Sequence, residues 1–138
     1  MPWVFDASIT LAWCFEDERT PETDSLLVRL KSDPATVPSL WYLEVANVLT
    51  QAMRKKQPRL TLSKRAEFLA MLTFQDIRVD TATASQAWSS TLHLADSHRL
   101  STYDAAYLEL AMRLGVELAT LDEPLRKAAK AVGLTVIP

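Results

Sequence analysis

Four acidic residues, Asp6, Glu44, Asp104 and Asp122, have the types and positions that metal-dependent chemistry requires. Each stands where an apolar segment ends or where a helix would face inward, and no Lys or Arg lies close in sequence to the first three. Two like charges about 4 Å apart repel by about 4 kcal/mol at an effective dielectric constant of about 20. Gathered carboxylates therefore bind protons more tightly or take up a divalent cation. The pattern indicates a hard-cation site suited to phosphodiester chemistry.

Three of these acids also have an ordinary structural explanation. Asp6 and Asp122 each follow an apolar run, where an Asp side chain commonly caps the next helix. Asp104 is the third residue after Ser101, as in a capping box. Taken singly, none of the three distinguishes a cap from a metal ligand.

Glu44 belongs to a polar stripe on a long, mostly apolar predicted helix, with Asn47 one turn further on. Such a stripe faces either solvent or a site. The very apolar segment 39–43 that precedes Glu44 indicates a helix buried over much of its circumference, which favours the site.

The elements that must position these acids are predicted as alternating strands and helices. Strands are expected at Trp3–Phe5, Ala35–Pro38, Ile77–Val79, Val116–Leu121 and Leu134–Ile137. Helices are expected after Asp6, over Pro21–Leu30, over Leu40–Lys55 behind a Ser39 cap, from Thr61 or Ser63, over Ala82–Leu94, over Tyr103–Leu114 begun by Ser101 and Thr102, and over Glu123–Val132. Gly115 and Gly133 are placed as helix stops. This alternation predicts an α/β fold whose parallel sheet is covered on both faces. Ligands gather beyond the carboxyl ends of parallel strands, so the four acids can converge at one edge.

The composition limits the class of protein. A chain of 138 residues with 49% hydrophobic content fits a single domain over residues 1–138. Its one cysteine, Cys14, excludes a disulfide framework or a thiolate zinc site and is typical of a reducing cytoplasm, where we expect the protein. The sequence shows no signal peptide, membrane span or Gly-rich phosphate loop.

The formal net charge of −2 argues against nucleic-acid binding by bulk electrostatics. Any polynucleotide contact must be local. Two basic clusters are candidates, residues 54–56 with Arg59, and residues 126–127 with Lys130. Solvated helix ends, with cations that complement the negative end of a helix dipole, are the more ordinary explanation of either cluster.

Four segments together resemble the PIN-domain nucleases, most closely the VapC toxins of bacterial and archaeal toxin–antitoxin pairs. The segment Tyr-Asp-Ala-Ala-Tyr-Leu at 103–108 is the most specific, and Glu-Val-Ala-Asn at 44–47 is next. The strand ends Val-Phe-Asp-Ala-Ser at 4–8 and Ala-Thr-Leu-Asp at 119–122 add weight when taken with them. The similarity spans nearly the whole chain.

The resemblance implies a three-layer α/β/α domain with a mainly parallel central sheet that hydrolyses RNA phosphodiester bonds. It implies that Asp6, Glu44, Asp104 and Asp122 form a site for Mg²⁺ or Mn²⁺, with some contacts passing through water. It also implies supporting roles for Ser8, Asn47 and Thr120, which lie in the same segments as Asp6, Glu44 and Asp122. The expected partners are an RNA substrate, a small antitoxin that covers the acidic groove, and a second copy in a homodimer.

Other functions remain open at this stage. The same fold could serve a housekeeping nuclease acting in RNA processing or on DNA, or a non-catalytic PIN-like binding module. A phosphoaspartyl phosphatase is conceivable from Asp6 alone, but that chemistry usually requires a second acid two residues on, where this chain has Ser8.

Overall fold

The computed structural model describes all 138 residues and contains one five-stranded sheet in which every neighbouring pair is parallel. The strands are β1 (Trp3–Phe5), β2 (Ala35–Pro38), β3 (Ile77–Asp80), β4 (Glu117–Ala119) and β5 (Val136–Ile137). Their order across the sheet is β3-β2-β1-β4-β5. The first strand of the chain therefore lies at the centre, between strands that come later in the sequence.

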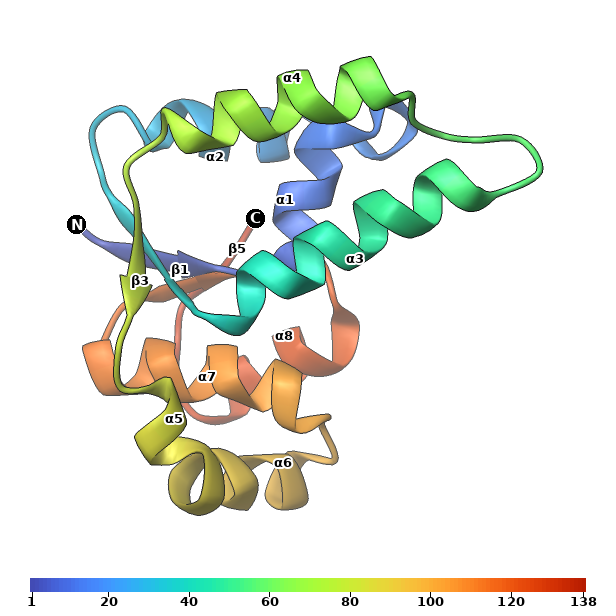
Figure 1. Ribbon diagram of the computed structural model, residues 1–138. Helices are drawn as coiled ribbons and strands as arrows, with labels where there is room; N and C mark the ends of the chain where they lie inside the picture. The colour runs from blue at the N-terminus through green and yellow to red at the C-terminus, as the bar shows by residue number, and fades with distance from the viewer.

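Helices cover both faces of this sheet (Figure 1). They are α1 (Ala7–Cys14), the short η1 (Glu16–Glu18), α2 (Pro21–Arg29), α3 (Leu40–Arg54), α4 (Leu62–Thr73), α5 (Thr83–Gln86), η2 (Ala87–Thr91), α6 (Leu92–His98), α7 (Thr102–Leu114) and α8 (Glu123–Ala131). Figure 1 shows α1, α2 and α4 on one side and α5 to α8 on the other, and the connection from α3 to α4 projects from the body. None of these helices is long and apolar enough to cross a membrane.

The core is built around β1. Trp3, Val4 and Phe5 have no exposed surface, as expected for a central strand covered on both faces. The Phe5 ring packs against Trp13 of α1 and edge-on against Trp41 of α3, with ring centroids 5.1 and 5.7 Å apart. Aromatic pairs of this geometry add to the burial of apolar area. They fix the two helices that follow the carboxyl ends of β1 and β2.

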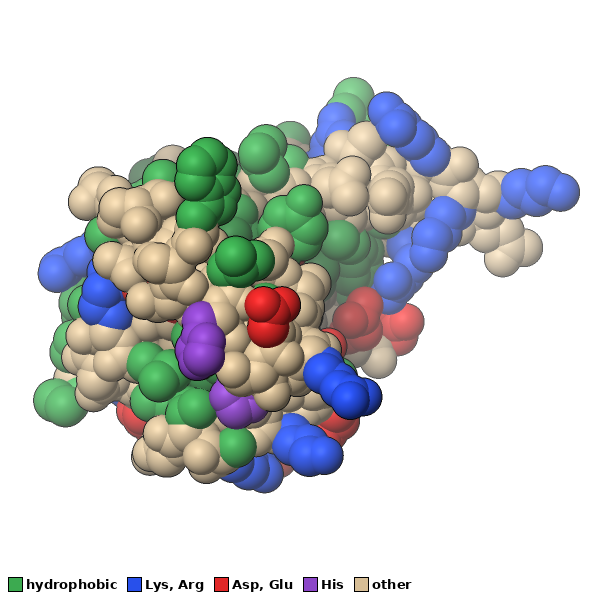
Figure 2. Space-filling model, turned by 90° about the horizontal axis from the view of Figure 1, so that it is seen from below, with side chains coloured by type: hydrophobic (Ala, Val, Ile, Leu, Met, Phe, Trp, Pro, Cys, Tyr) green, Lys and Arg blue, Asp and Glu red, His purple; other side chains and the backbone are tan.

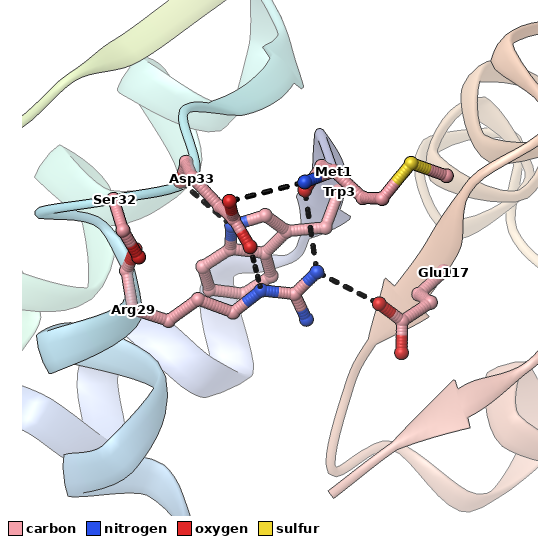
Figure 3. A network of polar contacts seen from close by, with 6 residues as sticks. All are labelled: Met1, Trp3, Arg29, Ser32, Asp33 and Glu117. Carbon is pink, nitrogen blue, oxygen red and sulfur yellow. Dashed lines mark hydrogen bonds and ion pairs between the residues drawn. The ribbon is translucent and has the colours of Figure 1, made fainter.

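The opposite end of β1 is held by a polar network around Arg29 of α2 (Figure 3). The Arg29 guanidinium pairs with Asp33 at 3.2 Å and with Glu117 of β4 at 2.7 Å, and it lies over the ring of Trp3. Asp33 also accepts from the amino group of Met1 at 3.0 Å. The network ties the amino ends of β1 and β4 to α2, at the sheet edge away from Asp6.

Most predicted elements are confirmed, including the parallel sheet and the helix stops at Gly115 and Gly133, both of which have positive φ. Three details were wrong. The Ser39 side chain makes no capping hydrogen bond. The strands predicted over Val116–Leu121 and Leu134–Ile137 are limited to Glu117–Ala119 and Val136–Ile137. The helix predicted to end at Leu94 continues to His98 and contains a π-helical segment.

The longer helix has a local reason. The stretch from Ala95 to His98 contains no Gly or Pro to end it, and termination comes only at Arg99, which adopts the left-handed conformation with φ 54° and donates its N–H to the Ala95 carbonyl. A non-glycine residue in that conformation is uncommon and is not readable from local sequence.

Candidate functional site

Asp6 lies directly after β1, at the carboxyl edge of the sheet. Its backbone N–H donates to the carbonyl of Ala119 on β4, and its Oδ1 accepts from the N–H of Ile9 at 3.3 Å. It therefore caps α1, as the structural explanation predicted. Its side chain is only 4% exposed, a depth that capping alone does not require.

Two hydroxyls hold the Asp6 carboxylate. Ser8 donates to Oδ1 at 2.5 Å and Thr120 donates to Oδ2 at 2.6 Å. Each hydroxyl in turn accepts a backbone N–H from the segment after β4, Ser8 from Leu121 and Thr120 from Asp122. Both carboxylate oxygens are thus fixed in direction, and the end of β4 is tied to the start of α1.

Burial raises the pKa of Asp6 to about 6. Loss of water around the charged form is the main cause, and the nearby charge of Asp104 adds to it. The hydrogen bonds from Ser8, Thr120 and Ile9 act in the other direction but do not compensate. The native site therefore holds Asp6 in an environment that opposes its charge.

Glu44, on α3, meets Tyr107, on α7, across the same edge. The Tyr107 hydroxyl donates to Glu44 Oε1 at 2.5 Å, and the Tyr107 side chain is fully buried. Burial raises the pKa of Glu44, the hydrogen bond from Tyr107 lowers it, and the charge of Asp104 raises it further. Glu44 is thus oriented by a neutral donor and has no cation beside it.

A second hydrogen-bonded chain sets α3 against α1. The indole N–H of Trp41 donates to Thr10 Oγ1 at 2.9 Å, and the Thr10 hydroxyl donates to the Asp6 carbonyl at 3.2 Å. Trp41 precedes Glu44 by one turn on α3. The position of Glu44 relative to Asp6 is therefore set by buried contacts.

Asp104 lies in the first turn of α7, and its N–H donates to the Ser101 hydroxyl that caps the helix. Asp122 caps α8 by accepting the N–H of Leu125 at 3.0 Å. Burial raises the pKa of Asp104, and the charge of Asp122 raises it further. Asp104 perturbs Asp6 and Glu44 as well, so its charge lies within reach of all three other acids.

The four acids are the only buried or half-buried acids of the chain without a cationic partner, since the other unpaired acids are all exposed. None of them forms an ion pair with Lys or Arg, whereas ten ion pairs occur elsewhere. The contrast is clearest between Asp6 and Glu109, the two fully buried acids of the chain. Glu109 is 4% exposed like Asp6, but Arg113 pairs with it at 2.7 Å and also joins it to Asp80. Asp6 has only hydroxyl and backbone donors.

The donor set suits a hard divalent cation, because all four side chains offer carboxylate oxygen. In this conformation no three Asp, Glu, His or Cys side chains close into a metal-ligand cluster. Mg²⁺ does not require such a cage, since it keeps several waters and binds one or two carboxylates together with substrate phosphate. An open group of acids with uncompensated charge fits that mode of binding.

An apolar cavity of about 260 Å³ lies apart from these acids, between α3, α4 and β3. Trp41, Val45, Leu69, Leu72 and Ile77 are among its lining residues, and none of the four acids is. The cavity therefore belongs to the packing between helices and not to the carboxylate site.

The supporting residues expected from sequence differ in their contacts. Ser8 and Thr120 touch Asp6, as described. Asn47 is exposed one turn after Glu44 and makes no side-chain hydrogen bond within the chain. Tyr107 was missed as a site residue, although its position three residues after Asp104 places the two on one face of a helix.

The family model described as "PIN domain" matches residues 3–131, which include all four acids. A search of the curated proteins gives no match.

Solved structures share the fold at low sequence identity. PAE2754 from Pyrobaculum aerophilum is 19% identical, with a TM-score of 0.69 over 99% of this chain and 89% of that one. VapBC2 from Rickettsia felis, solved bound to a DNA fragment from their promoter, is 12% identical, with a TM-score of 0.64 over 99% and 97% of the two chains. FitAcB from Neisseria gonorrhoeae is 15% identical, with a TM-score of 0.57 over 99% and 96%.

Proposed function

This chain belongs to the PIN domain family, and from that premise we propose that it is a Mg²⁺- or Mn²⁺-dependent endoribonuclease, the toxin of a VapBC-type toxin–antitoxin pair. The observation that carries the nuclease proposal is the group of four carboxylates without a cationic partner. Asp104 acts on the pKa of both Asp6 and Glu44, and Asp122 acts on that of Asp104. A divalent cation would relieve the repulsion within such a group.

Asp6, Glu44, Asp104 and Asp122 would hold the ion. The chemistry that a bound ion would supply is a coordinated water of lowered pKa and stabilisation of charge on the phosphate. The chain's own residues prepare this site. Ser8 and Thr120 fix both oxygens of Asp6, and each hydroxyl is held by a backbone N–H, so the carboxylate does not reorganise when a cation arrives.

The toxin–antitoxin assignment rests on the resemblance in the four sequence segments and on the fold shared with VapBC2 and FitAcB. It brings with it a small antitoxin as partner, a homodimer and a cytoplasmic location. A housekeeping nuclease with RNA or DNA as substrate, or a non-catalytic binding module, shares the same fold and is separated from the toxin by experiment.

The test is cleavage of a panel of structured RNAs and single-stranded DNAs by the purified protein with Mg²⁺ or Mn²⁺, and with EDTA. We expect metal-dependent cutting of RNA that is lost in Asp104→Asn. Asp96→Asn is the matched control, because Asp96 is an exposed acid on α6 and its replacement changes the net charge equally. Equal cleavage by both variants would remove Asp104 from the site.

The same panel separates the alternatives. Cutting of DNA in preference to RNA would support the DNA-directed nuclease. Binding of nucleic acid without cutting, in protein shown to bind Mn²⁺ by calorimetry, would support the non-catalytic module. Protein that neither binds Mn²⁺ nor cuts would refute the proposed function.

A further inference from the structure

The connection between α3 and α4, together with the adjoining helix ends, forms a projecting segment of unusual charge. We name residues 54–65 the basic tip. Six of the chain's 15 Lys and Arg residues lie in it, and it contains no Asp or Glu. The tip extends from the body in Figure 1, and Figure 2 shows Lys and Arg side chains gathered on that projection.

One of the six cations anchors the tip. Arg59 pairs with Asp17 and with Glu18, at 2.8 Å each, and its guanidinium lies over the ring of Phe15 at 4.1 Å. Its backbone N–H also donates to the Ala52 carbonyl of α3. The loop is therefore fixed to the body, and the charge of Arg59 is already neutralised.

The other five cations are left without partners. They form no ion pair, four are exposed and Arg65 is half-buried. The five are Arg54, Lys55, Lys56, Lys64 and Arg65. Fixed, unpaired cations on a projection attract a polyanion, and they do so in a protein whose net charge is −2.

Helix dipoles explain only part of this cluster. Arg54 ends α3, where a cation complements the negative pole. Lys64 and Arg65 lie at the start of α4, whose first turn contains no acid. Cations there oppose the dipole, at a cost of about 0.3–1 kcal/mol each. Their presence is not a helix-end preference, and an anion bound at this point would relieve the repulsion.

The tip is continuous with the proposed active site through α3. Glu44 and Arg54 are ten residues apart on this helix, which corresponds to about 15 Å along its axis. One nucleic-acid strand is long enough to contact the carboxylate site and the basic tip at the same time. Lysine is depleted at protein–protein interfaces, and Leu62 is the one large apolar side chain exposed on the tip, so a polyelectrolyte suits it better than a protein.

We propose that the basic tip binds the phosphate backbone of the RNA substrate, in a manner independent of base sequence. The inference rests on the proposed nuclease function and deepens it by naming where the substrate is held outside the metal site. It predicts that the tip's contribution to RNA affinity falls as the salt concentration rises, because its Lys and Arg side chains displace counterions from the phosphates.

The experiment measures binding of a labelled single-stranded RNA by the Asp104→Asn protein in EDTA, at several salt concentrations, so that neither cleavage nor metal contributes. The tip variant carries Lys55→Gln, Lys56→Gln and Lys64→Gln. Each phosphate contact contributes about 0.7 to the slope of log affinity against log salt for single strands. We expect the slope to become shallower by about 2 in the tip variant.

The matched control removes three exposed cations outside both basic clusters, with Arg19→Gln, Lys31→Gln and Arg78→Gln, and gives the same net charge. We expect its slope to equal that of the parent. An unchanged slope in the tip variant, or an equal loss in both variants, would overturn the inference. If polyglutamate binding depends on the tip and RNA binding does not, the tip serves an acidic protein segment and the inference is also overturned.

Failure of this inference is distinguishable from failure of the proposed function. Wild-type protein that cuts RNA, combined with a tip variant of unchanged slope, overturns only the role of the tip. Wild-type protein that neither cuts nor binds RNA overturns both. Circular dichroism of the tip variant confirms that all three replaced side chains can be lost without unfolding.

Discussion

Replacing Asp6 by Asn is expected to stabilise the metal-free protein above pH 6, although it removes a proposed metal ligand. The ionised Asp6 is 4% exposed and has no cationic partner, and its pKa is raised from 3.8 to about 6. An Asn side chain occupies the same volume without charge. The Ser8 and Thr120 hydroxyls can adapt to it, because a hydroxyl both donates and accepts.

The sign follows from proton linkage. The native protein binds a proton at Asp6 more tightly than the unfolded chain does, so native Asp6 holds more protons between about pH 4 and pH 6. The free energy of unfolding therefore falls as pH rises through this window, and the whole loss is present well above pH 6. At about 1.4 kcal/mol for each tenfold difference in proton affinity, the ionised Asp6 destabilises the native state by about 3 kcal/mol.

The assay is urea denaturation of wild type and Asp6→Asn in EDTA at pH 4 and at pH 7.5. Other carboxyls titrate in both proteins, so the difference between the two free energies of unfolding isolates Asp6. We expect the advantage of the Asn variant to grow by about 2.4 kcal/mol between the two pH values, because the unfolded Asp6 is already partly ionised at pH 4. The exposed Asp96→Asn should show no such growth. If the stability advantage of Asp6→Asn is the same at both pH values, burial does not raise the pKa of Asp6 and the reasoning is refuted.

Three further outcomes are expected. Mn²⁺ at 100 times its Kd should stabilise the wild type by about 2.7 kcal/mol and so raise its melting temperature. Calorimetric scans should show no such rise for Asp6→Asn. Tyr107→Phe, which leaves Glu44 without its donor, should weaken Mn²⁺ binding by about 10- to 100-fold in titration calorimetry; unchanged affinity would mean that Tyr107 only packs. Arg113→Met should lower urea stability by about 2 kcal/mol because buried Glu109 loses its partner, and adding Glu109→Gln should restore most of it.

Local sequence was sufficient for elements whose ends carry their own chemistry. Ser101 and Gly115 mark α7 because a hydroxyl cap and a left-handed glycine act within one helical turn. The π-helical segment and the stop at Arg99 were missed because no short-range residue preference specifies them. Strand β4 ends early because its length is set by pairing with β1 and β5, which lie far away in sequence.

The candidate site shows the same division. The acids could be named from sequence, because strand ends of a parallel sheet meet at one edge. The hydrogen bonds from Thr120 to Asp6 and from Tyr107 to Glu44 could not be predicted from sequence, since the paired residues lie 114 and 63 positions apart. Whether the four acids bind metal, and whether Asn47 takes part, stay predictions for the experiments above.

The central place of β1 has a consequence for biosynthesis. Asp6 leaves the ribosome well before its partner Thr120, which follows 114 residues later. At roughly 5–20 residues per second the interval is about 6 to 23 seconds. Until then β4 is missing, the Asp6 side chain lacks half of its hydroxyl contacts, and Asp122 has not been translated. A nascent chain therefore lacks the assembled carboxylate edge until both β1 and β4 have emerged and paired.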